Sequence, residues 1–205
     1  MTTTQANKTL VYVGGHVGVG ARQAIDRVKP DRVIIFEPHP DCVKTLKAKF
    51  PEARVVQAAC AEKTGFGVLR NYGLDSRSAS LFEITPEAVE VLKGFGVTDL
   101  GKQYGGIPTV LVNLGEWLKT EGLTEGLYVV LDCQGGDLAV AKTLKGLGVV
   151  EITAEVDGPI PHYKAVNGID AWTKEMLGWG FTQVWRRHDW TDPSEIQNDI
   201  RWVRA

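Results

Sequence analysis

The sequence predicts a doubly wound α/β fold, in which a mainly parallel β-sheet has helices on both faces and closes with an antiparallel C-terminal strand. Three observations predict this class. Short apolar runs rich in β-branched residues alternate with helix-like segments along most of the chain. The first of these runs, residues 9–13, stops at a glycine-rich turn. The second, residues 32–36, stops at an acid, Glu37.

Composition fits one globular domain of this class. The chain has 205 residues, 43% hydrophobic and 23% charged, and a chain of that size can bury a continuous core. We expect residues 1–8 to form a flexible N-terminal segment and residues 71–108 to form an insertion. The net charge of -2 predicts no general attraction to nucleic acid or to an anionic membrane.

The first half of the chain reads as alternating strands and helices. Apolar runs predict strands over residues 9–13, 32–36, 54–58 and 65–70. Apolar residues at helical spacing predict helices over residues 21–28 and 41–50. Asp41 is expected to cap the second helix, because a carboxylate there can accept a free backbone N–H.

The second half continues the alternation. Strands are expected over residues 109–112, 127–131 and 149–156, and helices over residues 115–120, 138–147 and 171–178. The runs at residues 181–186 and 199–203 read as a closing pair of strands. Between the halves, the insertion holds a serine-rich patch and a helix over residues 86–93. A segment of this length is either a substrate-facing loop or a surface excursion.

Cysteine usage and hydropathy bear on the compartment. The three cysteines, Cys42, Cys60 and Cys133, are odd in number and form no C-x-x-C pair, which argues against a disulfide framework or a zinc site. We interpret them as reduced core residues, which fits a cytoplasmic protein. No apolar run approaches the ~20 residues that a membrane span needs, so no membrane association is expected.

The glycine-rich turn and Glu37 together predict a nucleotide-like ligand. The turn GGHVGVG, residues 14–20, joins a strand to a helix, and glycines there allow ligand atoms to approach the backbone. It contains neither G-x-G-x-x-G nor a P-loop, but it contains the looser G-x-x-x-G common in binders of S-adenosyl-L-methionine. A carboxylate at Glu37 can accept both ribose hydroxyls. The alternatives are a ligand-free turn and a solvated acid.

Several segments match one known family in the same order. They are VYVGGHVG (11–18), RVIIFEPHP (32–40), AACAEKTG (58–65), SASL (78–81), VVLDCQGGD (129–137) and the terminal NDIRWVRA. On these segments the chain resembles the FkbM-type family of S-adenosylmethionine-dependent methyltransferases, which have a Rossmann-like class I methyltransferase fold. The likeness covers most of the chain outside residues 83–108.

The resemblance implies methyl transfer from S-adenosyl-L-methionine to a hydroxyl of a sugar or other small natural-product acceptor. It implies cofactor contacts along the glycine loop and the second strand, at Gly14, Gly15, His16, Gly18, Glu37 and Pro38, with Ala59 near the adenine. It also places Asp132 and Asp137 at the reacting end of the cleft.

Five positions depart from that family's pattern, and two of them, Gly15 and His16, replace its usual Ala-Asn pair. Tyr12 stands where an acid usually precedes the first glycine, Gly115 stands where an aspartate is common, and Asp137 replaces a glutamate. These departures leave an alternative open: a degenerate protein of this fold that binds the cofactor or a partner without catalysis. Another Rossmann-type enzyme is a third hypothesis, and the missing G-x-G-x-x-G counts against it.

Candidate catalytic residues must lie at strand ends beside the glycine loop. Asp132 ends an apolar strand and is the first choice of base for a hydroxyl nucleophile, unless it is only a turn former. Asp137 is either a second carboxylate or the cap of the following helix. His16 is a general base, a cofactor contact or a surface loop residue.

Other polar residues are candidates for contact with the acceptor. Ser78 and Ser80 can hydrogen-bond a polar acceptor, and His162 follows a turn that can face it. His39 can cover the adenine. No compact ligand motif predicts a metal, although Asp132, Asp137, Asp157 and His162 form an oxygen-rich set. Nucleic acid is disfavoured as an acceptor, because no Asn/Asp-Pro-Pro-[Tyr/Phe] motif is present.

Tryptophans are concentrated in the C-terminal third, at Trp172, Trp179, Trp185, Trp190 and Trp202. Core and edge packing is the simpler interpretation. The other is an aromatic surface, either a homodimer interface or a wall of the acceptor pocket.

Overall fold

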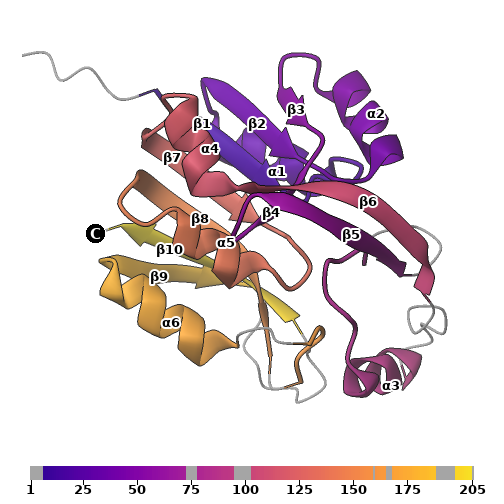
Figure 1. Ribbon diagram of the computed structural model, residues 1–205. Helices are drawn as coiled ribbons and strands as arrows, with labels where there is room; N and C mark the ends of the chain where they lie inside the picture. The colour runs from indigo at the N-terminus through magenta and orange to yellow at the C-terminus, as the bar shows by residue number, and fades with distance from the viewer. Residues whose placement is uncertain are drawn as a thin grey trace, which may run out of the picture.

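The computed structural model describes residues 7–72, 78–94, 103–158, 160–164, 168–187 and 197–204. Its main feature is a seven-stranded sheet with the order β3-β2-β1-β7-β8-β10-β9 (Figure 1). The strands are β1 Thr9–Val13, β2 Arg32–Phe36, β3 Arg54–Val56, β7 Glu125–Leu131, β8 Gly148–Asp157, β9 Phe181–Arg186 and β10 Gln197–Arg204. Strands β3, β2, β1, β7 and β8 of this sheet are parallel to one another, and β10 runs antiparallel to its neighbours β8 and β9. The predicted fold class is confirmed.

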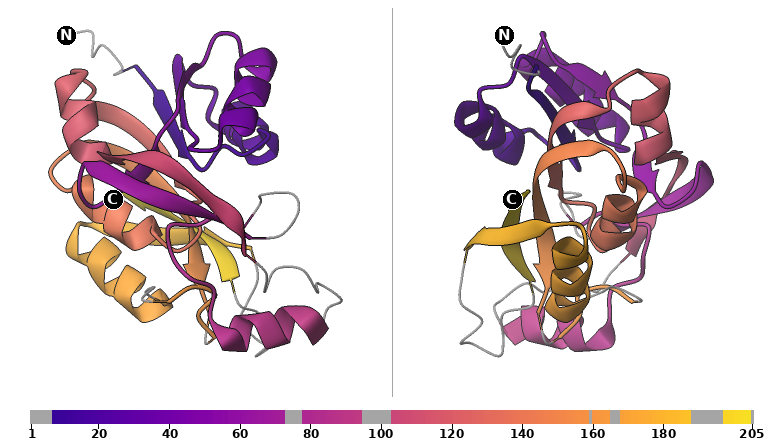
Figure 2. Two further views of the ribbon diagram at one scale, coloured as in Figure 1. Left: turned by 45° about the vertical axis from the view of Figure 1, so that its right-hand side comes forward. Right: turned by 90° about the vertical axis from the view of Figure 1, so that its left-hand side faces the viewer.

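Helices cover both faces of this sheet (Figure 2). Helices α1 (Val19–Val28) and α2 (Pro40–Lys49) pack on one face, against the alternate strand residues Leu10, Tyr12 and Ile35. Helices α4 (Leu114–Thr120), α5 (Asp137–Thr143) and α6 (Ile169–Gly178) pack on the other face. Because side chains alternate between the faces of a strand, β1 lies between two cores, and all five of its residues are buried.

The strand order creates a crevice beside β1. From β1 the chain passes to β2 on one side, and it returns through β7 on the other. The loops that leave the carboxyl ends of β1 and β7 therefore diverge, and ligands bind at this switch point in open α/β sheets. The glycine turn and Asp132 both lie here, since the Asp132 N–H donates to the carbonyl of Val13 at 3.0 Å.

A second, three-stranded sheet was not predicted. It has the order β4-β6-β5, from β4 (Ala59–Ala61), β6 (Gln103–Asn113) and β5 (Gly65–Tyr72). Strands β5 and β6 form an antiparallel arm that extends into both ends of the segment treated as an insertion. Helix α3 (Pro86–Gly94) follows β5 in the chain and lies to one side of the larger sheet (Figure 1). The two ends of the expected insertion therefore belong to strands of this arm.

Several boundaries differ from the sequence analysis for local reasons. Helix α2 is capped by His39, whose ring Nδ1 accepts the Asp41 N–H at 3.3 Å, so Asp41 lies inside the first turn. Helix α5 ends at Thr143, and tighter turns lead to Gly146, which has a φ of +84°. Among the described residues, no helix has both the length and the apolarity needed to cross a membrane.

Candidate functional site

The glycine turn is pinned between two strands. The N–H groups of Gly14 and Gly15 donate to the carbonyl of Phe36, at the end of β2, at 2.9 and 3.1 Å. Gly14 has a φ of +85°, and a Cβ at this position would lie 1.8 Å from the carbonyl oxygen of Asp132. Only glycine fits such a conformation and such a close approach. The turn thus lies against the ends of β2 and β7.

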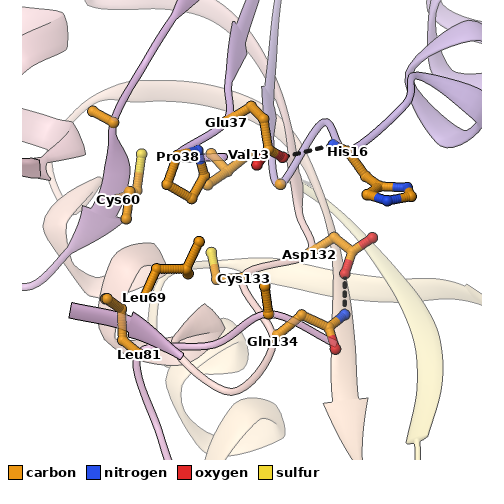
Figure 3. Close-up of a pocket in the computed structure, with 14 residues that line it drawn as sticks. Val13, His16, Glu37, Pro38, Cys60, Leu69, Leu81, Asp132, Cys133 and Gln134 are labelled. Carbon is orange, nitrogen blue, oxygen red and sulfur yellow. Dashed lines mark hydrogen bonds between the residues drawn. The ribbon is translucent and has the colours of Figure 1, made fainter. Parts of the chain in front are cut away.

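Glu37 stabilises the same turn from the end of β2. Its side chain is buried, with 6% of the residue exposed. One carboxylate oxygen accepts the His16 N–H at 2.7 Å (Figure 3), and the other accepts the His39 N–H at 2.8 Å. Burial raises the pKa of Glu37, and the two N–H donors oppose that rise. Each oxygen keeps a lone pair that can accept a hydroxyl donor.

A cavity of about 570 Å³, its open mouth included, lies beside Glu37. Its polar wall consists of His16, Glu37, Asp132 and Gln134 (Figure 3). The rest of the lining, apart from Gly14, is made of small or apolar residues: Val13, Pro38, Ala58, Ala59, Cys60, Leu69, Ala79, Leu81 and Cys133. An apolar slot beside a carboxylate that can accept hydroxyl groups suits a nucleoside, which presents a flat ring and a diol.

The carboxylate of Asp132, which lines this cavity, is joined to that of Glu155, which does not. The side-chain amide of Gln134 donates to Asp132 at 2.6 Å and to Glu155 at 3.0 Å, and its oxygen accepts the Tyr163 hydroxyl at 2.8 Å. Burial, together with the charge of Asp199, raises the pKa of Asp132 to about 6. Burial also raises the pKa of Glu155. A carboxyl group in this condition can take up a proton near neutral pH.

Asp137 lies next to this pair but does not line the cavity. Its carboxylate accepts the N–H groups of Cys133 and Gly135 at 2.9 and 3.2 Å, and so it closes the turn that follows β7. Burial raises the pKa of Asp137 to about 7, and the charge of Asp132 adds to the rise. Its observed contacts therefore position the backbone beside Asp132.

The serines and histidine expected near the acceptor surround Gln134 instead of lining the cavity. Ser80 is buried; its hydroxyl donates to the Gln134 carbonyl at 2.6 Å and accepts the Phe82 N–H. The carbonyl of Ser78 accepts the Tyr163 hydroxyl at 3.3 Å. His162 is buried and stacks on Tyr163, with ring centroids 4.5 Å apart. These contacts hold the Gln134 side chain and its turn in place.

Some of the residues expected to contact the cofactor line the cavity, and others do not. Gly14, His16, Glu37, Pro38 and Ala59 line the cavity, together with the catalytic candidate Asp132. Gly15 and Gly18 do not line it, because they face Leu46 of helix α2: a Cβ on Gly15 would lie 2.9 Å from that side chain, and one on Gly18 would lie 3.2 Å from it. Their role in the structure is to let α2 approach the turn.

Packing explains two of the departures from the family pattern. A Cβ on Gly20 would lie 2.2 Å from the hydroxyl oxygen of Tyr12. The large Tyr12 side chain therefore fits because position 20 is a glycine and has no side chain. A Cβ on Gly115 would lie 1.8 Å from the carbonyl oxygen of Thr143. An aspartate cannot occupy that position while α4 and α5 are in contact.

Sequence reasoning missed some of the site. The lining residues Cys60, Leu69 and Leu81 come from β4, β5 and the segment after it, whose pairing is not evident from local pattern. Glu155 carried a signal that was not used, since it is a charged residue within an apolar strand. Among the described residues, no three His, Cys, Asp or Glu side chains gather as metal ligands.

Comparison with known proteins supports the fold. No family model and no curated protein matches the sequence. The structure is similar to that of a protein from Listeria monocytogenes assigned as an S-adenosylmethionine-dependent methyltransferase. That match has a TM-score of 0.51 and 10% identity, and covers 97% of this chain and 90% of that one. A fibrillarin/Nop5p complex matches with a TM-score of 0.50 and 14% identity, over 98% and 74% of the two chains. At these identities the likeness shows a shared fold, that of class I methyltransferases.

Proposed function

We propose that this protein binds S-adenosyl-L-methionine and transfers its methyl group to a hydroxyl of a small acceptor, such as a sugar or a natural product. The observation that carries the proposal is the placement of Glu37. Its buried carboxylate is held by two N–H groups beside an apolar slot, at the switch point of a doubly wound sheet. The resemblance to FkbM-type methyltransferases supports the same assignment.

The residues present fit the cofactor. Glu37 would accept the two ribose hydroxyls through its remaining lone pairs, in place of the water lost on burial. Ala59, Leu69 and Leu81 would contact the adenine from the arm side of the cavity. The glycine turn lets the chain pass close to the methionine end, and His16 lies on the same side as Asp132 (Figure 3).

The proposed chemistry needs one base and accurate positioning. The cofactor supplies a methyl group on a positively charged sulfur. Asp132, with its pKa raised to about 6, would accept the proton of the acceptor hydroxyl. Gln134 would hold that carboxylate through the hydrogen bond at 2.6 Å, and Asp137 would position the turn that contains both. The neighbouring carboxylates also favour a sulfonium cation.

The small size of the acceptor is part of this proposal. The fold by itself does not choose between a small molecule and RNA, and the net charge of -2 favours the small molecule. The packing of Tyr12 against Gly20 weakens the non-catalytic alternative, because the departure at position 12 is accommodated by a matching residue.

Calorimetric titration with S-adenosylhomocysteine tests the proposal. We expect micromolar binding by the wild type. Glu37→Gln should weaken it about tenfold or more, roughly 1.4 kcal/mol, since the variant loses the charge and one acceptor oxygen. The control is Glu52→Gln, which changes an exposed glutamate and should leave the affinity unchanged. Absence of binding by the folded wild type would contradict the methyltransferase assignment and favour a non-catalytic protein of this fold.

A further inference from the structure

A second cavity lies on the face of the sheet that carries α1. It spans about 1180 Å³ with its open mouth included, and we refer to it as the α1-side pocket. Its lining consists of Tyr12, Gly20, Gln23, Ala24, Arg27, Val130, Leu131, Asp132, Thr153, Trp185, Arg187, Asp199 and Arg201. Among the described residues, Asp132 alone lines both cavities. The pocket therefore begins where the proposed cofactor cleft ends.

The α1-side pocket lies beside helix α1, over the part of this sheet face that α1 and α2 leave uncovered. Helices α1 and α2 pack over β1 and β2, and no described helix lies over β8, β10 and β9 on this side (Figure 2). The side chains that β8 and β10 contribute to the pocket, Thr153, Asp199 and Arg201, are polar where a covering helix would need them to be apolar. The sequence of this face is suited to a polar ligand.

The floor is one transverse row of side chains across five strands. In the strand register, Tyr12 pairs with Val130, Val130 with Thr153, Thr153 with Arg201, and Arg201 with Trp185. All five residues line the pocket. Adjacent residues in such a row project from the same face of the sheet, so they form a continuous surface from the side of Asp132 to the outer strand.

Arg201 is the distinctive member of the row. Its guanidinium lies over the ring of Trp185, 5.5 Å from the centroid, and its Nε is buried without a hydrogen-bond partner among the described residues. The neighbouring Thr153 hydroxyl is also buried, and it too has no hydrogen-bond partner among the residues that the structure describes. The other two arginines of the pocket are paired, Arg27 with Glu151 at 2.5 Å and Arg187 with Asp199 at 3.5 Å.

These observations point to an oxyanion. A buried guanidinium donor without a partner is costly, and a carboxylate or phosphate oxygen relieves that cost through charge-assisted hydrogen bonds. A hydroxyl beside it adds one more donor, and Trp185 offers a flat surface for the body of the ligand. Asp199 also lines the pocket, but it pairs with Glu155 in the next row of the sheet, so the anionic group would be held in the row of Arg201 and Thr153.

We propose that the α1-side pocket binds the methyl acceptor, and that the acceptor has a carboxylate or phosphate group held by Arg201 and Thr153, with its apolar part on Trp185. The inference rests on the proposed function, since Asp132 would lie between this anion and the cofactor. It narrows the acceptor class from any small hydroxylated molecule to a hydroxylated acid or a phosphorylated compound.

The test uses two probes, inorganic phosphate and benzoate, titrated into the protein without cofactor and followed by tryptophan fluorescence and by the indole NMR signals. We expect saturable binding of at least one probe by the wild type. Arg201→Gln should weaken it about tenfold or more, and Thr153→Val about threefold. The matched control is Arg186→Gln, because Arg186 pairs with the core residue Ile200 and projects from the opposite face.

Separate measurement of S-adenosylhomocysteine binding distinguishes the two proposals. Arg201→Gln should keep wild-type affinity for it, because Arg201 does not line the cofactor cavity. Saturation by neither probe, or equal binding by the wild type and both pocket variants, would overturn the anion site. Anion binding that depends on Arg201 in a protein without affinity for S-adenosylhomocysteine would overturn the acceptor role and leave the anion site supported.

Discussion

At the scale of single residues, the carboxyl group of Asp137, which closes the turn after β7, makes the stability of the protein depend on pH. Its carboxyl group is buried and accepts two backbone N–H groups, yet burial still raises its pKa from 3.8 to about 7. Between these two values the folded protein holds a proton that the unfolded chain has released. The free energy of unfolding therefore falls as the pH rises through this range, and the loss is complete above pH 7.

Asp137→Asn should remove this pH dependence. We expect the stability of the wild type, relative to the variant, to fall by at least about 1 kcal/mol between pH 5 and pH 8, with an upper limit of about 4 kcal/mol. Urea unfolding of both proteins at the two pH values measures the difference. Parallel profiles, with a constant offset between the proteins, would contradict a raised pKa at Asp137.

Single residues also mark the limit of sequence reasoning. Glu37 could be predicted as a ligand-facing acid, because it follows a buried strand and comes after a glycine turn. Its use of both oxygens to hold His16 and His39 could not be predicted, since it depends on where the turn lies in space. The same holds for Gln134, which looked like one turn residue among several and instead joins Asp132 to Glu155.

At the scale of elements, the contact between α4 and α5 depends on the absence of a side chain. The Gly115 N–H donates to the Thr143 hydroxyl at 3.1 Å, and a Cβ at Gly115 would lie 1.8 Å from the Thr143 carbonyl oxygen. The two helices therefore meet backbone to backbone, at the edge of the core that supports the turn containing Asp132.

Gly115→Ala should destabilise the protein by about 2 kcal/mol or more, because the added methyl group forces α4 away from α5. The matched control is Gly94→Ala in α3, where nothing lies within 4 Å of the added Cβ and the higher helix propensity of alanine leaves stability unchanged or slightly raised. Thermal or urea unfolding compares them. Equal effects of the two substitutions would show that α4 and α5 can separate without cost.

Elements were predictable where their pattern is local. The strands at Thr9–Val13 and Arg32–Phe36 matched their predicted bounds, because a buried parallel strand is a short, continuous apolar run. The arm was not predictable, because Phe66 pairs with Val110 across a long intervening segment. The sequence of β6 also mixes Gly105, Gly106 and Pro108 into the strand, which reads locally as a turn.

At the scale of the whole molecule, function depends on which distant segments become neighbours. The doubly wound class follows from alternation along the chain. The proposed cofactor cavity requires β4, β5 and the segment after β5 to close over the glycine turn, and the α1-side pocket requires five strands in one register. Such arrangements depend on long-range pairing, so the sequence predicts the crevice but not the walls that would select the ligand.

The described tryptophans of the C-terminal third lie in different surroundings. Trp172 and Trp202 are buried and stack with ring centroids 5.1 Å apart, which joins α6 to β10 in the core. Trp185 is exposed over 41% of its surface and lines the α1-side pocket. Trp190 lies outside the described residues. The cluster therefore has a core part and a part that faces the proposed acceptor.

The central claim is that the cavity between the glycine turn and the arm binds S-adenosyl-L-methionine. The most direct measurement is the amide NMR spectrum of the wild type during titration with S-adenosylhomocysteine. We predict that saturable shifts concentrate at His16, His39, Ala59 and Cys133, whose backbone lies in or beside the cavity, while amides of α6 stay in place. Shifts confined to other parts of the chain, or no shifts at saturating ligand, would contradict the account.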